Sequence, residues 1–226
     1  MLGMSGEQIV FLLISVGIVL VATVLHEVAH AACAYVLGDS TAKERGRLTL
    51  NPFAHLDPVG SVLLPLLMGL AGGPIFAFAK PVPYNPRRLR KPVVDEVLVA
   101  FAGPACNLVQ ALVGTVVFRV LMGMYENGFG DPQVMYVVAQ TAASYVYLNL
   151  MLMFFNLIPL PPLDGSAIVS PLLRGKARMW YYQVQRYALP VLLAVMYLVP
   201  MVLHVNPLGT YLAATAGRLT TVLLGF

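Results

Sequence analysis

The stretch His26-Glu27-Val28-Ala29-His30 combines two histidines and a glutamate at a spacing that suits metal chemistry. Four residues of an α-helix turn through about 400°, so both imidazoles lie on one face and can bind the same ion. Tetrahedral zinc binds histidine nitrogens at about 2.0–2.1 Å. Glu27 is turned about 100° away from His26, beside the ion, where it can accept a proton from an activated water. The pattern predicts a zinc-dependent hydrolase with Glu27 as general base.

A purely structural interpretation leaves the two histidines at a helix end and extends Glu27 to a membrane surface. Ionisable side chains inside a membrane segment cost about 2.5–3.5 kcal/mol each on insertion scales. This cost favours the functional interpretation.

Two histidines leave zinc one protein ligand short, and Asp164 is the strongest candidate for the third. It follows the run Asn156-Leu157-Ile158-Pro159-Leu160-Pro161-Pro162-Leu163, whose prolines stop a helix and hold an extended stretch. Gly165 then permits a backbone turn. Without the histidine pair, a helix-capping aspartate would be the simpler interpretation. His55 lies among turn residues, and His204 is expected on the opposite membrane face.

The composition identifies a polytopic membrane protein. Hydrophobic residues make up 59% of the 226 positions and charged residues only 11%, against about 25% in soluble domains. The mean hydropathy of +0.79 agrees. No basic stripe with interleaved aromatics is present, so no nucleic-acid partner is expected. Cys33 and Cys106 lie in apolar stretches and are expected to be small core residues.

Five stretches approach the roughly 20 apolar residues that a membrane-spanning helix needs. They are Ile9–Leu37, Val97–Met124, Val134–Ile158, Tyr187–Leu203 and Leu208–Leu224. The first is too long for a signal-peptide core, so we expect a retained membrane helix.

A sixth apolar stretch, Val59–Ala79, contains Pro65 and Gly72-Gly73-Pro74, which interrupt a regular helix. The segments on both sides of it, Asp39–Asp57 and Lys80–Glu96, are basic, and basic segments mark the cytoplasmic side. Gly165–Arg186 is also basic, whereas Tyr125–Gln133 carries only acidic charge. We therefore expect a re-entrant segment, with an ordinary sixth span as the alternative. The N-terminus is then outside, and His26, His30 and Asp164 lie toward the cytoplasm.

Three motifs together resemble the site-2 protease family of intramembrane zinc metalloproteases. They are His26–His30, the Gly103-Pro104-Ala105-Cys106-Asn107 stretch, which is similar to a G-P-x-x-N motif, and Asn156–Gly165, which is similar to N-x-x-P-x-P-x-x-D-G. The resemblance covers roughly Leu20 to Ser166. Ala29 stands where the family often has glycine, and no PDZ-like or CBS-like part is visible, so we expect a small, minimal member.

The resemblance implies that His26, His30 and Asp164 bind zinc, with Glu27 as base. It also implies that Asn156 and Asn107 lie near the site. Asn156 is expected to orient substrate or an oxyanion, and Asn107 to pack or to contact substrate. Either asparagine can instead cap a helix or bond between helices.

The segment Pro74–Tyr84 alternates and is rich in β-forming residues. A membrane protease must bind its substrate locally unwound, and strand addition at an exposed edge is a simple way to do so. We expect a short β element here on the cytoplasmic side, with Phe76 and Phe78 contacting substrate. An aromatic surface loop at the membrane interface is the alternative.

These expectations describe an all-α polytopic membrane protein with about five transmembrane helices plus the re-entrant or sixth segment. Residues 1–226 form one membrane-embedded metalloprotease domain, with a core at about 9–172 and two further helices within 187–226. The expected partners are a transmembrane protein or peptide substrate and the lipid bilayer of the cell membrane. A metal-binding transporter or a non-catalytic metal sensor is the alternative function.

Overall fold

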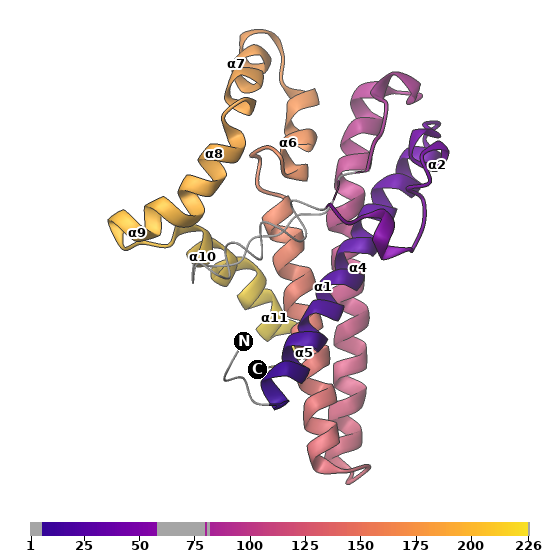
Figure 1. Ribbon diagram of the computed structural model, residues 1–226, viewed down its shortest axis with the longest axis vertical. Coiled ribbons are helices and arrows are strands. Elements are labelled where there is room, and N and C mark those ends of the chain that lie inside the picture. The colour runs from indigo at the N-terminus through magenta and orange to yellow at the C-terminus, as the bar shows by residue number, and fades with distance from the viewer. Residues whose placement is uncertain (1–5, 58–79, 81, 226) are drawn as a thin grey trace.

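A computed structural model of the protein describes residues 6–57, 80 and 82–225 and consists of helices joined by loops (Figure 1). Three helices are long: α1 (Gly6–Val36), α4 (Pro92–Glu126) and α5 (Pro132–Asn156). α4 and α5 run side by side, and α1 packs across them (Figure 1). Pro132 opens α5 at a position where its missing N–H costs nothing, and Asp131 caps it by accepting from the amides of Gln133 and Val134.

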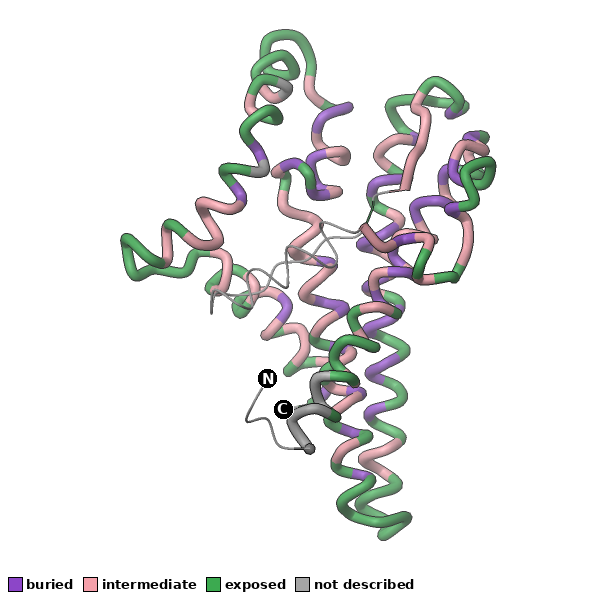
Figure 2. Tube along the Cα trace, in the orientation of Figure 1, coloured by how far each residue is buried: buried purple, intermediate pink, exposed green. Residues whose placement is uncertain are grey.

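Small side chains allow α4 and α5 to approach closely. Ala111, Ala139 and Ala142 are buried in their shared core. A Cβ atom at Gly114 would lie 3.0 Å from the Tyr145 and Val146 side chains. Small residues at helix interfaces are typical of membrane bundles, where close contact replaces the hydrophobic effect. Burial follows the surfaces where the long helices meet, while their outer faces are exposed and apolar (Figure 2).

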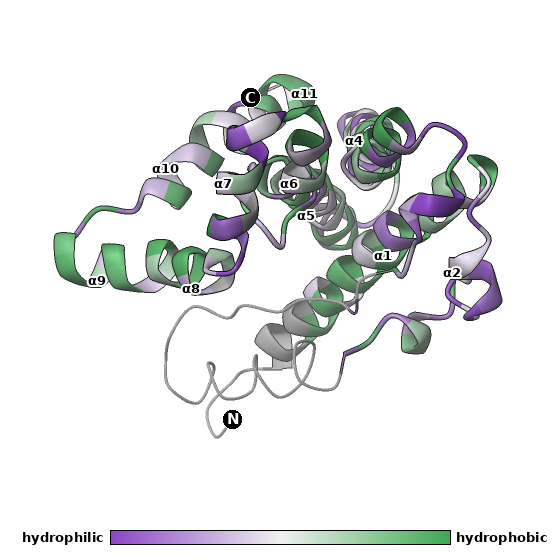
Figure 3. Cartoon of the chain, turned by 90° about the horizontal axis from the view of Figure 1, so that it is seen from above, coloured by the Kyte–Doolittle hydropathy of each residue, from purple (hydrophilic) through white to green (hydrophobic). Residues whose placement is uncertain are grey.

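Short elements connect α1 to α4 at one end of the bundle: α2 (Thr41–Glu44), η1 (Pro52–Ala54) and η3 (Pro86–Arg88). Viewed from above, polar residues gather around α2 and on α7, whereas α8, α9 and most of α1 are apolar (Figure 3).

The chain after α5 forms shorter helices. They are α6 (Asp164–Val169), η4 (Ser170–Leu172), α7 (Gly175–Gln185), α8 (Ala188–Leu193), the π-helical η5 (Ala194–Leu198), α9 (Val199–Leu203), α10 (Pro207–Leu212), the π-helical η6 (Ala213–Gly217) and α11 (Arg218–Leu224). α11 returns to the bundle, where Arg119 of α4 donates to the carbonyl of Leu223 at 2.9 Å.

Three of the five predicted spans are confirmed as single long apolar helices, at α1, α4 and α5. The prediction of five spans is not confirmed: the described residues contain three helices of sufficient length, or four if α7 and residues 190–203, bent by 65°, form one span. Helical runs do occupy 188–203 and 207–224, but π-helical turns interrupt both. His204, in the left-handed region at φ 52°, separates the two runs.

The predicted β element is not confirmed. Residues 74–79 and 81 lie outside the described part of the chain. The expected re-entrant or sixth segment, residues 59–79, also lies outside it. Among the described residues, 80 and 82–84 belong to no strand. Pro81 and Pro83 carry no amide hydrogen, which removes ladder donors that a sheet would need.

Asp39, fully buried just after α1, fastens the two ends of the α1–α4 connection together. Its carboxylate accepts from the amide and hydroxyl of Thr41 and from the amide of Asn85. Burial alone raises the pKa of Asp39, but these donors and the nearby Arg88 outweigh it and hold the pKa below its usual value. A lowered pKa in the folded state adds stability above the unfolded value of about 3.9, and that stability is lost as pH falls through the folded value.

Replacing Asp39 by Asn should lower the stability of the purified protein at neutral pH. Hydrogen bonds to charged groups contribute about 1.5–3 kcal/mol. The side-chain NH2 group of the new asparagine would also point a donor at a backbone amide that now donates to Asp39. Thermal unfolding in detergent at pH 7 and at a pH below the lowered folded-state pKa of Asp39 measures the effect, which should shrink in acid. Glu126→Gln, which changes an exposed carboxylate at the far end of α4, is the control and should leave the midpoint unchanged. A loss for Asp39→Asn that is equally large in acid would contradict this account.

Candidate metal centre

The structure brings His26, His30 and Asp164 together inside the helix bundle. The two Nε2 atoms, one turn apart on α1, lie 3.1 Å from each other. Asp164 Oδ2, on the first residue of α6, lies 3.1 Å from His26 Nε2 and 3.3 Å from His30 Nε2. Among the described residues, this is the group of histidine, cysteine and acidic side chains whose donor atoms could hold one metal ion.

The hydrogen-bond partners of the two imidazoles determine which nitrogens point at the centre. His30 Nδ1 faces the carbonyl of Val99 at 2.6 Å, and that oxygen can only accept. His26 Nδ1 faces Asn107 Oδ1 at 2.5 Å. Each Nδ1 therefore carries the hydrogen, and each Nε2 directs a lone pair into the centre.

A chain of buried amides fixes the orientation of Asn107. Asn149 donates from Nδ2 to the carbonyl of Tyr145 at 3.0 Å, so its Oδ1 is the atom left to accept. Asn107 Nδ2 donates to that oxygen at 2.9 Å, which turns Asn107 Oδ1 toward His26. Both asparagines are completely buried, as such a network requires.

Gly103 of α4 makes room for the two imidazole rings. A Cβ atom at this position would lie 2.6 Å from His26 Nε2 and closer still to His30 Nε2. No real Cβ contact is that short, so only glycine admits both rings against α4.

The turn between α5 and α6 presents Asp164. α5 ends at Asn156, and Leu163 donates its amide to the carbonyl of Leu160 at 3.0 Å before α6 begins. Gly165 is required here because of space and not because of a left-handed turn: its φ is not positive, and an added Cβ would lie 2.5 Å from the carbonyl oxygen of Ile158.

The donor set fits zinc. Two imidazole nitrogens and one carboxylate oxygen leave a fourth position free, the arrangement of catalytic zinc sites. Asp164 Oδ2 is buried and makes no counted hydrogen bond, and its polar neighbours are the Nε2 atoms of His26 and His30 at 3.1 and 3.3 Å. A cation at the centre would offset the cost of burying this carboxylate oxygen and the two imidazole nitrogens.

Glu27 lies beside the ligand group and is not part of it. The side chain is half-buried, and its Oε2 accepts from the amide of Val82 at 3.1 Å. The role of Glu27 as general base stays a prediction.

The remaining predicted residues lie as follows. His55 is buried, faces the carbonyl of Thr49 with Nε2 at 2.8 Å and lies outside the ligand group. Asn156 is half-buried at the end of α5 and donates to the carbonyl of Leu152 at 3.0 Å; its substrate-orienting role stays a prediction. Substrate contact by Asn107 also stays a prediction. Phe76 and Phe78 lie outside the described residues.

Sequence reasoning missed Asn149, the Val99 carbonyl and Val82. Asn149 carried a usable signal, because an asparagine in the middle of an apolar helix is costly without a partner. The Val99 carbonyl and the Val82 amide are backbone groups and carry no side-chain signal.

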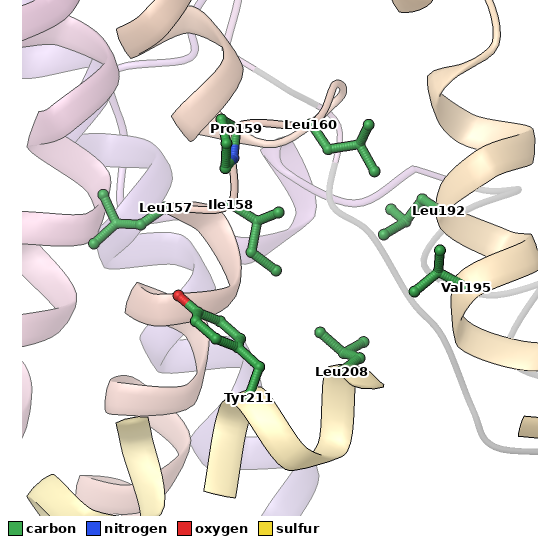
Figure 4. A pocket seen from close by; sticks show the side chains of 8 residues that line it. All are labelled: Leu157, Ile158, Pro159, Leu160, Leu192, Val195, Leu208 and Tyr211. Atoms are coloured by element: carbon green, nitrogen blue, oxygen red, sulfur yellow. The ribbon is translucent and has the colours of Figure 1, made fainter. Parts of the chain in front are cut away.

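An apolar cavity of about 290 Å³ lies beside the turn that presents Asp164 (Figure 4). Its walls are Leu157, Ile158, Pro159 and Leu160 of that turn and Leu192, Val195, Leu208 and Tyr211 of the C-terminal helices. None of these residues belongs to the ligand group.

Comparisons with known proteins agree with this chemistry. Residues 122–199 match the sequence profile of Peptidase family M50. The chain is 40% identical over 193 residues to "Putative zinc metalloprotease YwhC" of Bacillus subtilis, covering 85% of this chain and 80% of that protein. It is 32% identical over 187 residues to "Putative zinc metalloprotease Rip2" of Mycobacterium tuberculosis, covering 80% of this chain and 65% of that protein. No solved structure gives a significant match.

The relationship to the Bacillus protein extends over most of both chains. The family match, the relatives and the histidine–aspartate cluster all point the same way. The protein is therefore a member of peptidase family M50, the site-2 protease family, and is a zinc metalloprotease.

Proposed function

We propose that this zinc metalloprotease hydrolyses peptide bonds of transmembrane substrates within the bilayer, near its cytoplasmic side. The observation that carries the proposal is the depth of the histidine pair. His26 and His30 belong to a candidate membrane span that ends at Val36, 10 and 6 residues further on. At about 1.5 Å per residue, the pair lies roughly 9–15 Å inside that end of the helix.

His26, His30 and Asp164 are the proposed zinc ligands. Their convergence, the Nε2 atoms of both imidazoles turned toward the centre and the burial of Asp164 Oδ2 between them support this assignment. Asn107 is proposed to orient His26 through Nδ1, with Asn149 holding Asn107 in turn. Outer partners of this kind fix the tautomer and the ring direction of a metal-binding histidine.

Glu27 is the proposed general base. When bound, zinc acts as a Lewis acid that makes water nucleophilic near neutral pH and polarises the scissile carbonyl. The Glu27 carboxylate accepts the proton from the attacking water and passes it to the leaving amine. Its place beside the ligands, with one oxygen bonded to Val82, supports this role.

The proposed orientation puts the N-terminus outside and the centre toward the cytoplasm of the cell membrane. Basic segments follow α1, lead into α4 and follow α5, and all three lie at one end of the bundle (Figure 1). The α4–α5 turn with Asp131 lies at the other end. Positive segments favour the cytoplasmic side. A transporter or sensor is not favoured, because the relatives are named as metalloproteases.

The first test separates the base from a ligand. Glu27→Gln should retain about one zinc per chain yet cleave a membrane-helix substrate at least about 10²-fold more slowly, because it keeps the size of the side chain and removes the base. Asp164→Ala should lose zinc as well as activity. Elemental analysis and a cleavage assay in detergent or liposomes measure both quantities.

A chelator should abolish wild-type cleavage, and added zinc should restore it. Wild-type rates in Glu27→Gln would disprove the mechanism, and full zinc content in Asp164→Ala would remove this residue from the ligand set. Cleavage of soluble peptides alone would contradict the intramembrane proposal.

Gly103→Ala should lower zinc content and activity, since the added methyl overlaps both imidazoles. Gly123→Ala is the matched control in the same helix, because a Cβ there meets nothing within 4 Å. Alanine raises helix propensity at both sites by about 1 kcal/mol, so propensity cannot explain a loss confined to position 103. Equal zinc content in the two variants would contradict the steric role of Gly103.

Single cysteines in place of Arg45 and Arg88 should be labelled from the cytoplasmic side only, and a cysteine replacing Phe129 from the outside. All three positions are exposed. The background carries Cys33→Ser and Cys106→Ser, and an impermeant maleimide applied to cells and to inverted vesicles reads the sides. Labelling of positions 45 and 88 from opposite sides would show that 59–79 crosses the membrane.

A further inference from the structure

Val82, which lies shortly before η3, contacts the side chain of the proposed base Glu27. Val82 donates its amide to Glu27 Oε2 at 3.1 Å, across 55 positions of sequence. The surrounding sequence is Lys80-Pro81-Val82-Pro83-Tyr84. Because prolines carry no amide hydrogen, Val82 supplies the single backbone donor of the Pro-Val-Pro unit, and that donor meets the proposed base.

The N-terminal side of this unit is fastened to the loop after α2. Lys80 donates its amide to the carbonyl of His55 at 2.9 Å, and Arg47 donates from Nη2 to the carbonyl of Lys80. Arg47 and His55 are only 7% and 2% exposed, so two costly buried polar side chains adjoin this one attachment.

The C-terminal side is fastened to the end of α1. The amide of Asn85 donates to the buried carboxylate of Asp39, and the amide of Arg90 donates to the carbonyl of Leu37 at 3.3 Å. The unit is therefore attached on both sides to parts of the chain that adjoin the helix carrying Glu27. Prolines at 81 and 83 also limit the backbone freedom between the attachments.

We propose that Val82 is a positioning residue for hydrolysis: its amide holds Glu27 Oε2, so that Oε1 is the oxygen presented to the attacking water. This inference rests on the proposed role of Glu27 as base. A glutamate side chain has several rotatable bonds, and a fixed donor selects one arrangement before substrate binds. The Arg47, His55 and Asp39 contacts then serve the chemistry indirectly, by holding Val82 in reach of Glu27.

The test compares Val82→Pro, which removes the amide hydrogen, with Val82→Ala, which keeps it and removes only the side chain. Val82→Pro should lower kcat about 10- to 100-fold, the usual effect of losing an outer-shell partner, with KM little changed. Val82→Ala should retain wild-type kcat. Both variants should hold the same zinc per chain as the wild type.

A backbone ester at position 82, introduced as α-hydroxyisovaleric acid, keeps the valine side chain and removes only the N–H. It should show the same kcat loss as Val82→Pro, and it decides the matter if the proline variant does not fold. Wild-type kcat in the ester variant, or an equal loss in Val82→Ala, would overturn the proposal. If the wild-type protein cleaves no membrane helix, the intramembrane proposal fails separately, and the same variants are then compared on an unstructured soluble peptide.

Discussion

The structure depends on a concentration of negative charge and lone pairs inside the helix bundle. Two imidazole nitrogens and a carboxylate oxygen converge there, and the carboxylate oxygen is buried. Such a cluster is unfavourable in a buried place unless a cation occupies its centre. With zinc held at these proposed ligands, ion binding and local packing would be coupled, because the ion would stabilise the arrangement of helices that forms its site. This constraint explains why the residues around the centre cannot be freely replaced by others.

Each helix around the centre contributes something different. α1 carries both histidines and the proposed base, so their relative placement is fixed by helical geometry alone. In α4, Gly103 has no side chain and so leaves space for both imidazoles. The Val99 carbonyl and Asn107 of the same helix orient the imidazoles through their Nδ1 atoms. α5 supports Asn107 through Asn149 and leads into the turn that presents Asp164. The centre is thus assembled from four helices, α1, α4, α5 and α6, and its precision depends on how closely they pack.

The connection between α1 and α4 adds a second level of organisation. Its buried polar residues make little sense as packing, because polar groups are expensive away from water. Their burial is explained if they hold the Pro-Val-Pro unit in place, because the backbone amide of this unit donates to Glu27. Polar residues outside the ligand group would in this way support the base, while the α4 and α5 network supports the ligands.

The sequence by itself determined the membrane class, the zinc chemistry and the candidate ligands. Their signals are local: a spacing of four on a helix, a proline-rich run before an aspartate, and three long apolar stretches that the structure confirms as helices. Tertiary structure alone decided that Asn107 bonds to His26, 81 positions away, that Gly103 faces both imidazoles, and that Val82 meets Glu27. In the tertiary structure, the C-terminal apolar stretches form several shorter helices. The expected strand is not confirmed among the described residues. Local spacing fixes which side chains share a helix face, whereas contacts between distant backbone groups and side chains exist only once the helices pack against one another.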